Sequence, residues 1–168
     1  MDRELLLRAR AGDREAFELI VLAKGEPLFR TALAILGSEA DARDATQEAF
    51  IAAWGSFARL RDTERFDAWL GRILINECRM ALRKRRRVRE VAVDDVRPAD
   101  SSAAPDSTGF DDAFARLTVD QRALLVLHHV HGYGVREIGA WLGIPSGTVK
   151  WRLNRARNAL RAELERES

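Results

Sequence analysis

Residues 135–161 constrain the fold more than any other stretch, because they describe two short helices joined by a tight turn. Gly143 fits the end of the first helix, where a left-handed backbone is often needed and a Cβ would be strained. Pro145 fits the first turn of the second helix, where its missing N–H would have no intrahelical partner. The second helix then repeats apolar residues along one stripe, at Val149, Leu153, Ala156 and Leu160. The pattern predicts a helix-turn-helix unit.

The opposite face of the second helix is basic. No carboxylate occurs between residues 146 and 161, where the cations are Lys150, Arg152, Arg155, Arg157 and Arg161. A helix of this charge suits the major groove of DNA. The alternative is a solvated basic face on a core helix, since charge spacing alone is a weak signal.

Charge is divided unevenly along the 168 residues. Residues 1–87 contain 17 Lys and Arg against 14 Asp and Glu, and residues 113–168 contain 9 against 5. Residues 88–112 contain 2 against 7. Two basic lobes flank an acidic connector, an arrangement that suits two nucleic-acid contacts on one chain.

No strand pattern competes along the chain, so we expect an all-α fold. Asp13 is a candidate N-cap for the second helix, and Ser38 or Asp41 for the third. Pro27 either kinks the second helix or divides it. Before the helix-turn-helix, we expect helices at residues 4–11, 13–36, 42–54, 66–87 and 121–130, with a polar loop at 56–64.

The chain is expected to form two small helical domains, residues 1–88 and 112–168. Residues 89–111 contain two prolines, several serines and acids, and almost no large apolar residue. This composition predicts a flexible acidic linker.

Several classes of site are disfavoured. Cys78 is the only cysteine, which excludes an intramolecular disulfide and the usual metal-binding pairs, so we interpret it as a core residue rather than a redox sensor. His128, His129 and His131 lack supporting ligands and are interpreted as polar positions at a helix end. No catalytic triad or phosphate-binding glycine loop is found, so we expect neither an enzyme nor a cofactor. With no signal peptide and no apolar run of about 18 residues, we expect a cytoplasmic protein without membrane insertion.

The first lobe carries a recognisable motif. Asp41–Phe50, followed by Trp54, resembles the D-A-x-D-x-x-Q-E-x-F signature of bacterial sigma factors. Phe66–Ile73, with Asn76 and the basic run at 83–87, resembles the part of sigma region 2 that comes after that signature.

The second lobe continues the resemblance. Residues 117–132 and 138–157 are similar to sigma region 4. The short chain, without further regions, resembles the extracytoplasmic-function class. The resemblance implies a non-catalytic promoter-specificity subunit that binds core RNA polymerase and helps to open promoter DNA.

The resemblance implies that one helix docks on the clamp helices of the polymerase β′ subunit, with the β flap as a further contact. The polymerase-binding residues would be Asp41, Asp44, Gln47 and Glu48. The alternative is helix capping by Asp41 and a solvated acidic face. Phe50 and Trp54 are interpreted as core residues.

A second implied contact is the non-template strand of the −10 element. It needs cations for phosphates and a pocket for an unstacked base. The family usually has a small, glycine-containing loop where this chain has residues 60–65, which leaves the captured base open. The basic run at 83–87 is either a backbone contact or a soluble helix end. The candidate −10 residues are Arg59, Arg61, Arg65, Arg72, Asn76 and Arg79.

The third implied contact is the −35 element, read by the basic helix. Arg155 and Lys150 suit guanine, Asn154 suits adenine, and Thr148 and Arg152 suit phosphates. Trp151 is unusual where many relatives have a small residue. It either packs on a thymine methyl or sugar, or covers the domain.

The partners implied are therefore core RNA polymerase, promoter DNA and an anti-sigma factor. Two other functions are compatible with parts of the sequence. A stand-alone helix-turn-helix regulator explains the second lobe alone, and a sigma-like protein that sequesters a partner is the other alternative.

Overall fold

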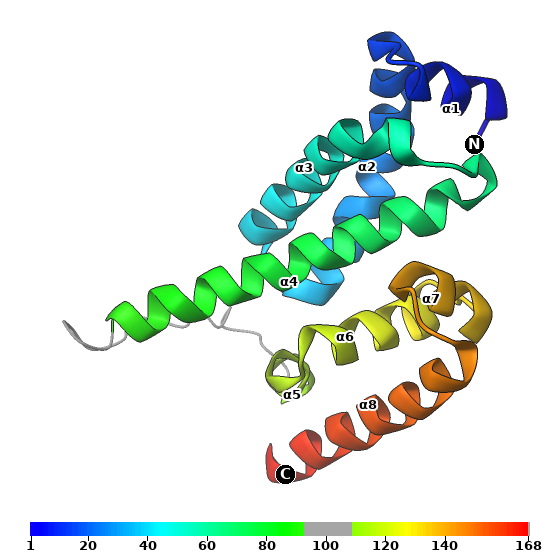
Figure 1. Cartoon of the computed structure of the whole chain (residues 1–168). Coiled ribbons are helices and arrows are strands. Elements are labelled where there is room, and N and C mark those ends of the chain that lie inside the picture. The colour runs from blue at the N-terminus through cyan, green and yellow to red at the C-terminus, as the bar shows by residue number, and fades with distance from the viewer. Residues whose placement is uncertain (93–108, 168) are drawn as a thin grey trace.

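The computed structural model describes residues 1–92 and 109–167. Within these ranges every regular element is a helix, which confirms the all-α prediction. The helices form two lobes that lie against each other, with the long helix α4 between them (Figure 1).

The first lobe holds the N-terminal half of the chain. Its N-caps follow local sequence signals as predicted, since the side chains of Asp13 and Ser38 accept from the N–H groups of Ala16 and Asp41. Pro27 lies inside a helix without ending it. The elements are α1 (Arg3–Arg10), α2 (Arg14–Leu36), α3 (Glu39–Ser56), η1 (Phe57–Arg59), η2 (Thr63–Arg65) and α4 (Phe66–Ala92).

Helix α3 begins at Glu39 and ends at Ser56, beyond both ends of the expected 42–54, and two segments expected to be irregular are partly helical. The expected polar loop at 56–64 contains two 3₁₀ turns, because Phe57 and Leu60 are buried and hold the chain against the lobe. The expected linker at 89–111 is helical at both ends, since α4 reaches Ala92 and α5 begins at Gly109. Residues 93–108, where linker flexibility was expected, lie outside the described residues.

The second lobe contains the predicted helix-turn-helix. Gly143 has φ +68°, and Ile144 N–H donates to Gly139 O at 2.9 Å to close the first helix. Pro145, expected in the first turn of the second helix, instead lies immediately before it, and its carbonyl accepts from Val149 N–H. The elements are α5 (Gly109–Arg116), α6 (Val119–Leu125), the π-helical segment η3 (Val126–Val130), α7 (Val135–Leu142) and α8 (Ser146–Glu167).

The two lobes share buried apolar surface. Ala123 and Val126 of the second lobe pack within the core of the first. Trp141 of α7 lies so close to α4 that a Cβ on Gly71 would overlap its ring. Cys78 is buried in the same core, as expected, and burial raises the pKa of its thiol to about 12.

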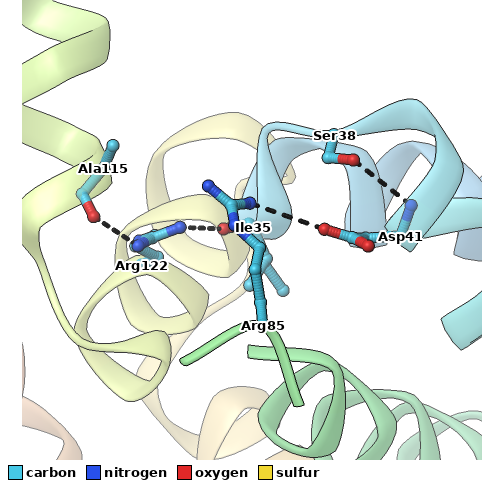
Figure 2. A network of polar contacts seen from close by, with 6 residues as sticks. All are labelled: Ile35, Ser38, Asp41, Arg85, Ala115 and Arg122. Atoms are coloured by element: carbon cyan, nitrogen blue, oxygen red, sulfur yellow. Dashed lines mark hydrogen bonds and ion pairs between the residues drawn. The ribbon is translucent and has the colours of Figure 1, made fainter. Parts of the chain in front are cut away.

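The buried guanidinium of Arg122 forms hydrogen bonds with both lobes. Arg122 of α6 donates through Nη1 to Ile35 O at 2.9 Å, across the lobe boundary, and through Nε to Leu117 O at 3.0 Å. Its Nη2 donates to Ala115 O (Figure 2). The acceptors lie at or just after the ends of α2 and α5, where carbonyls lack intrahelical partners. Desolvation lowers the pKa of Arg122, and nearby Arg85 lowers it further.

Gly71→Ala should loosen the lobe interface, because the added methyl would occupy space held by the Trp141 ring. Overpacking of this kind costs about 1–3 kcal/mol of unfolding free energy, measurable by urea denaturation. Gly25→Ala is the control, since a Cβ there meets nothing within 4 Å and alanine favours the helix by about 0.5–1 kcal/mol. Equal stability of the two variants would contradict the packing described.

Arg122→Ala should destabilise the chain by about 2–4 kcal/mol, because three carbonyls lose a charged donor and two of these hydrogen bonds are buried. Arg161→Ala removes an exposed arginine and should change stability by less than about 0.5 kcal/mol. Urea midpoints followed by circular dichroism make the comparison. If Arg122→Ala lowers the free energy of unfolding by less than about 1 kcal/mol, the hydrogen bonds of Arg122 contribute little to stability.

Candidate functional site

The four residues expected to face the polymerase lie on α3. Asp44, Gln47 and Glu48 are exposed. Asp41 is half-buried, and its Oδ2 lies 3.4 Å from Nη1 of Arg85 on α4 (Figure 2). Three of the four side chains are therefore open to a partner, whereas Asp41 also links α3 to α4.

Negative charge accumulates where α3 meets α4. The pKa of the Glu77 carboxyl on α4 is raised by burial and, secondly, by the charge of Glu48. A cationic partner at this edge would relieve the repulsion between these carboxyl groups.

An apolar groove between α2 and α3 runs beside Gln47. Its apolar lining is Phe17, Val21, Phe29, Phe50, Ile51 and Trp54. Phe50 is buried as predicted, but the prediction that Trp54 is a core residue is wrong, since the side chain is 40% exposed. Trp54 sits at the edge of the buried stripe of α3 and packs on Phe17, with ring centroids 4.9 Å apart.

Sequence reasoning missed several exposed apolar side chains on α2 and α3. Leu22 on α2 is 80% exposed, and Leu19 and Ile51 are more than half exposed. Residues 16–23 contain more apolar side chains than one helical stripe accommodates, and this excess was the available signal. Of the three, Ile51 lines the groove and adds exposed apolar area to it, as expected of an interaction surface.

The loop candidates for −10 recognition line an open cleft between the lobes. Arg59, Arg61 and Arg65 are exposed, and Arg65 forms a 3.6 Å ion pair with Asp62. The opposite wall of the cleft is the turn of the helix-turn-helix, residues 143–146. The structure thus brings the loop arginines beside the second lobe.

The helical candidates share one face of α4, as their spacing indicated, and this face is turned toward the second lobe. Arg72 lies against Gly143, where an added Cβ would come within 2.6 Å of its Nη1. Arg79 donates to Asn76 Oδ1 at 2.6 Å and to Asp120 Oδ1 at 2.8 Å. Arg79 is therefore paired with the second lobe in this arrangement, whereas Arg72 lies beside it and stays exposed.

Helix α8 presents the candidates for −35 recognition on the side opposite its core residues. Val149, Leu153 and Ala156 are buried, as the apolar stripe predicted. The guanidinium carbon of Arg155 lies 4.8 Å from the centroid of the Trp151 ring. Thr148 and Arg152 are half-buried, and the exposed candidates are Lys150, Trp151, Asn154 and Arg155.

The histidines of the η3 region have separate partners. His128 Nδ1 lies 3.0 Å from a backbone carbonyl, and His129 accepts from Arg157 at 3.3 Å. His131 hydrogen-bonds Thr31 of the first lobe at 3.1 Å. In the described part of the chain no three His, Cys, Asp or Glu side chains are grouped as metal ligands. Across the same residues, no helix is long and apolar enough to cross a bilayer.

Two family models match the chain. Sigma-70 region 2 matches residues 21–88, and Sigma-70, region 4 matches residues 108–160. The first match spans the candidate polymerase and −10 residues, and the second spans the helix-turn-helix.

Individual sigma factors match over almost the whole chain. The ECF sigma factor SigM of Mycobacterium tuberculosis is 34% identical over 95% of this chain and 82% of its own length. SigW of Bacillus subtilis is 28% identical, covering 98% and 97%.

Two solved structures have a similar fold. CnrH, in complex with the cytosolic domain of CnrY, is 31% identical, covers 99% of both chains and superposes with a TM-score of 0.71. RpoE of Bartonella quintana, in complex with the anti-sigma factor NepR, is 29% identical over 89% of this chain and 96% of its own, with a TM-score of 0.64. The chain belongs to the extracytoplasmic-function sigma factors, which bind core RNA polymerase and direct transcription initiation at specific promoters.

Proposed function

We propose that residues 1–88 bind the β′ clamp helices of core polymerase through the exposed side of α3 and the apolar groove beside it. Gln47 and Glu48 offer hydrogen-bonding groups at the edge of an exposed apolar surface. An apolar centre with a polar rim is the usual composition of a protein interface. The β flap would contact the second lobe, residues 112–168.

The −35 element would be read by the exposed side of α8. Arg155 presents a planar fork suited to the O6 and N7 atoms of guanine, and Asn154 has the matching groups for adenine. Thr148 and Arg152 are half-buried at the edge of this side. They would bind phosphates and set the position of the helix on the DNA.

The −10 element would be bound by the loop arginines and by the face of α4 that carries Arg72, Asn76 and Arg79. In the closed arrangement Arg72 and Asn76 are exposed, but Arg79 is paired with Asp120 of the second lobe, so this ion pair must break before the guanidinium can bind a phosphate. Residues 89–111 would act as the tether. Polymerase would then hold both lobes at promoter spacing, and each contact would raise the effective concentration of the other.

An anti-sigma factor is a further proposed partner. Both similar solved structures are complexes, CnrH with CnrY and RpoE with the anti-sigma factor NepR. The exposed α2–α3 groove and the α8 face are natural targets, because an inhibitor bound there would block polymerase or DNA.

The observation that carries these assignments is the separation of two exposed faces, one on α3 and one on α8, in a chain whose two lobes match two sigma regions. A stand-alone regulator would have no need of the first. Transcription with purified core polymerase, with and without the chain, followed by sequencing of transcript 5′ ends, tests the proposal. Transcripts that share no upstream motif, or core that fails to bind the chain, would refute it.

Gln47→Ala combined with Glu48→Ala should weaken core binding about tenfold, or about 1.4 kcal/mol, because both exposed side chains lose their polar contacts. Glu4→Ala removes an exposed carboxylate from α1 of the same lobe and is the control. Fluorescence anisotropy of labelled chain titrated with core measures the affinity. Equal affinities for the three proteins would remove α3 from the interface.

Asp120→Asn should raise the affinity of the free chain for a single-stranded −10 oligonucleotide several-fold, because Arg79 loses its carboxylate partner. The salt dependence should steepen by about 0.7 per phosphate gained. Asp112→Asn changes an exposed acid in the first turn of α5 and is the matched control.

An equal gain in affinity for the oligonucleotide in Asp112→Asn would mean that the change in net charge alone is responsible. Adding Arg79→Ala to the Asp120 variant should abolish the gain. Persistence of the gain in that double variant would show that Arg79 does not bind the DNA.

A further inference from the structure

We propose that Trp151 is a positioning residue that holds the guanidinium of Arg155 ready to read a guanine in the −35 element. This inference rests on the proposed function of α8. It concerns a side chain whose role the sequence left open between a direct DNA contact and a cover for the domain.

Trp151 does not cover the lobe. Its side chain is 58% exposed, and it belongs to none of the buried clusters among the described residues. The neighbouring stripe, with Val149 and Leu153, already packs α8 against the rest of the lobe. The indole therefore stands on the face of α8 that points away from the core.

A lone exposed apolar residue needs no explanation, but Trp151 carries a cation on its ring. Arg155 follows at i+4, and helical side chains lean toward the N-terminus, so its stem extends back over the indole. The 4.8 Å separation lies within the range of cation–π attraction. Along α8 from residue 146 to 162 no acidic side chain competes for the guanidinium.

Stacking on Trp151 would lower the entropy that Arg155 loses when it binds a base. Bidentate recognition of guanine needs the guanidinium fork in one orientation, and a free arginine loses rotamer entropy to reach it. A guanidinium resting on a ring keeps its N–H edges available while its motion is restricted. Trp151 would thus act through Arg155, and its removal should affect one base position.

The test is a reconstituted holoenzyme transcribing a promoter library randomised across the −35 element. Trp151→Leu keeps an apolar side chain but removes the ring, and should lower the guanine preference at one position three- to tenfold. Trp151→Phe keeps a ring and should retain most of the preference. Arg155→Lys keeps the charge without the fork and should lose the preference although the ring remains.

The double variant Trp151→Leu with Arg155→Ala separates the two roles. If Trp151 acts through Arg155, the double variant has the same base preferences as Arg155→Ala alone. A preference for thymine that is lost with Trp151 in both backgrounds would show a direct contact and overturn the inference. Equal loss at all positions, or no change in the guanine preference, would overturn it too.

The free protein provides an independent readout. Arg155 Nε–Hε should show a ring-current shift in NMR spectra that disappears in Trp151→Leu, and circular dichroism should confirm that this variant is folded. Absence of the shift in the wild-type chain would overturn the inference. Failure of the wild-type holoenzyme to select any −35 sequence would instead count against the proposed function.

Discussion

Arg122 joins the two halves of this molecule through carbonyls that α2 and α5 leave without intrahelical partners. Those carbonyls carry the negative ends of the helix dipoles, so one guanidinium satisfies unpaired acceptors at the ends of both helices. Burying a charge is costly unless it is fully hydrogen-bonded, and here the acceptors come from both lobes. The position of the second lobe on the first depends on this arrangement, supported by the contact between Trp141 and α4.

The closed arrangement divides the proposed contacts into free and engaged groups. The polar side of α3 and the basic side of α8 are exposed, whereas Arg72 and Arg79 on α4 lie next to the second lobe. Asp120 offers Arg79 the same chemistry as a DNA phosphate, a negatively charged oxygen acceptor. If this face binds the −10 element as proposed, a phosphate would compete with Asp120 for the Arg79 guanidinium.

Local signals predicted local structure well. The caps at Asp13 and Ser38 and the left-handed turn at Gly143 depend on hydrogen bonds and torsions within a few residues, which neighbouring sequence determines. Trp54 was misassigned because periodicity marks an apolar stripe but not where its edge meets solvent. The buried Phe57 escaped the loop prediction because its partners, Phe17 and Trp69, come from distant segments.

The sequence by itself determined the helical class, the helix-turn-helix, the polar residues of α3 and the basic face of α8, since each depends on residue types at short spacing. Only the tertiary structure decided that the lobes close on each other, that Arg79 is paired with Asp120, and that Arg155 rests on an exposed Trp151. The closure of the lobes and the Arg79–Asp120 pair depend on contacts between residues distant in the chain, which periodicity and composition do not predict. The third depends on which rotamers two neighbouring side chains adopt, and i,i+4 spacing permits that contact without specifying it.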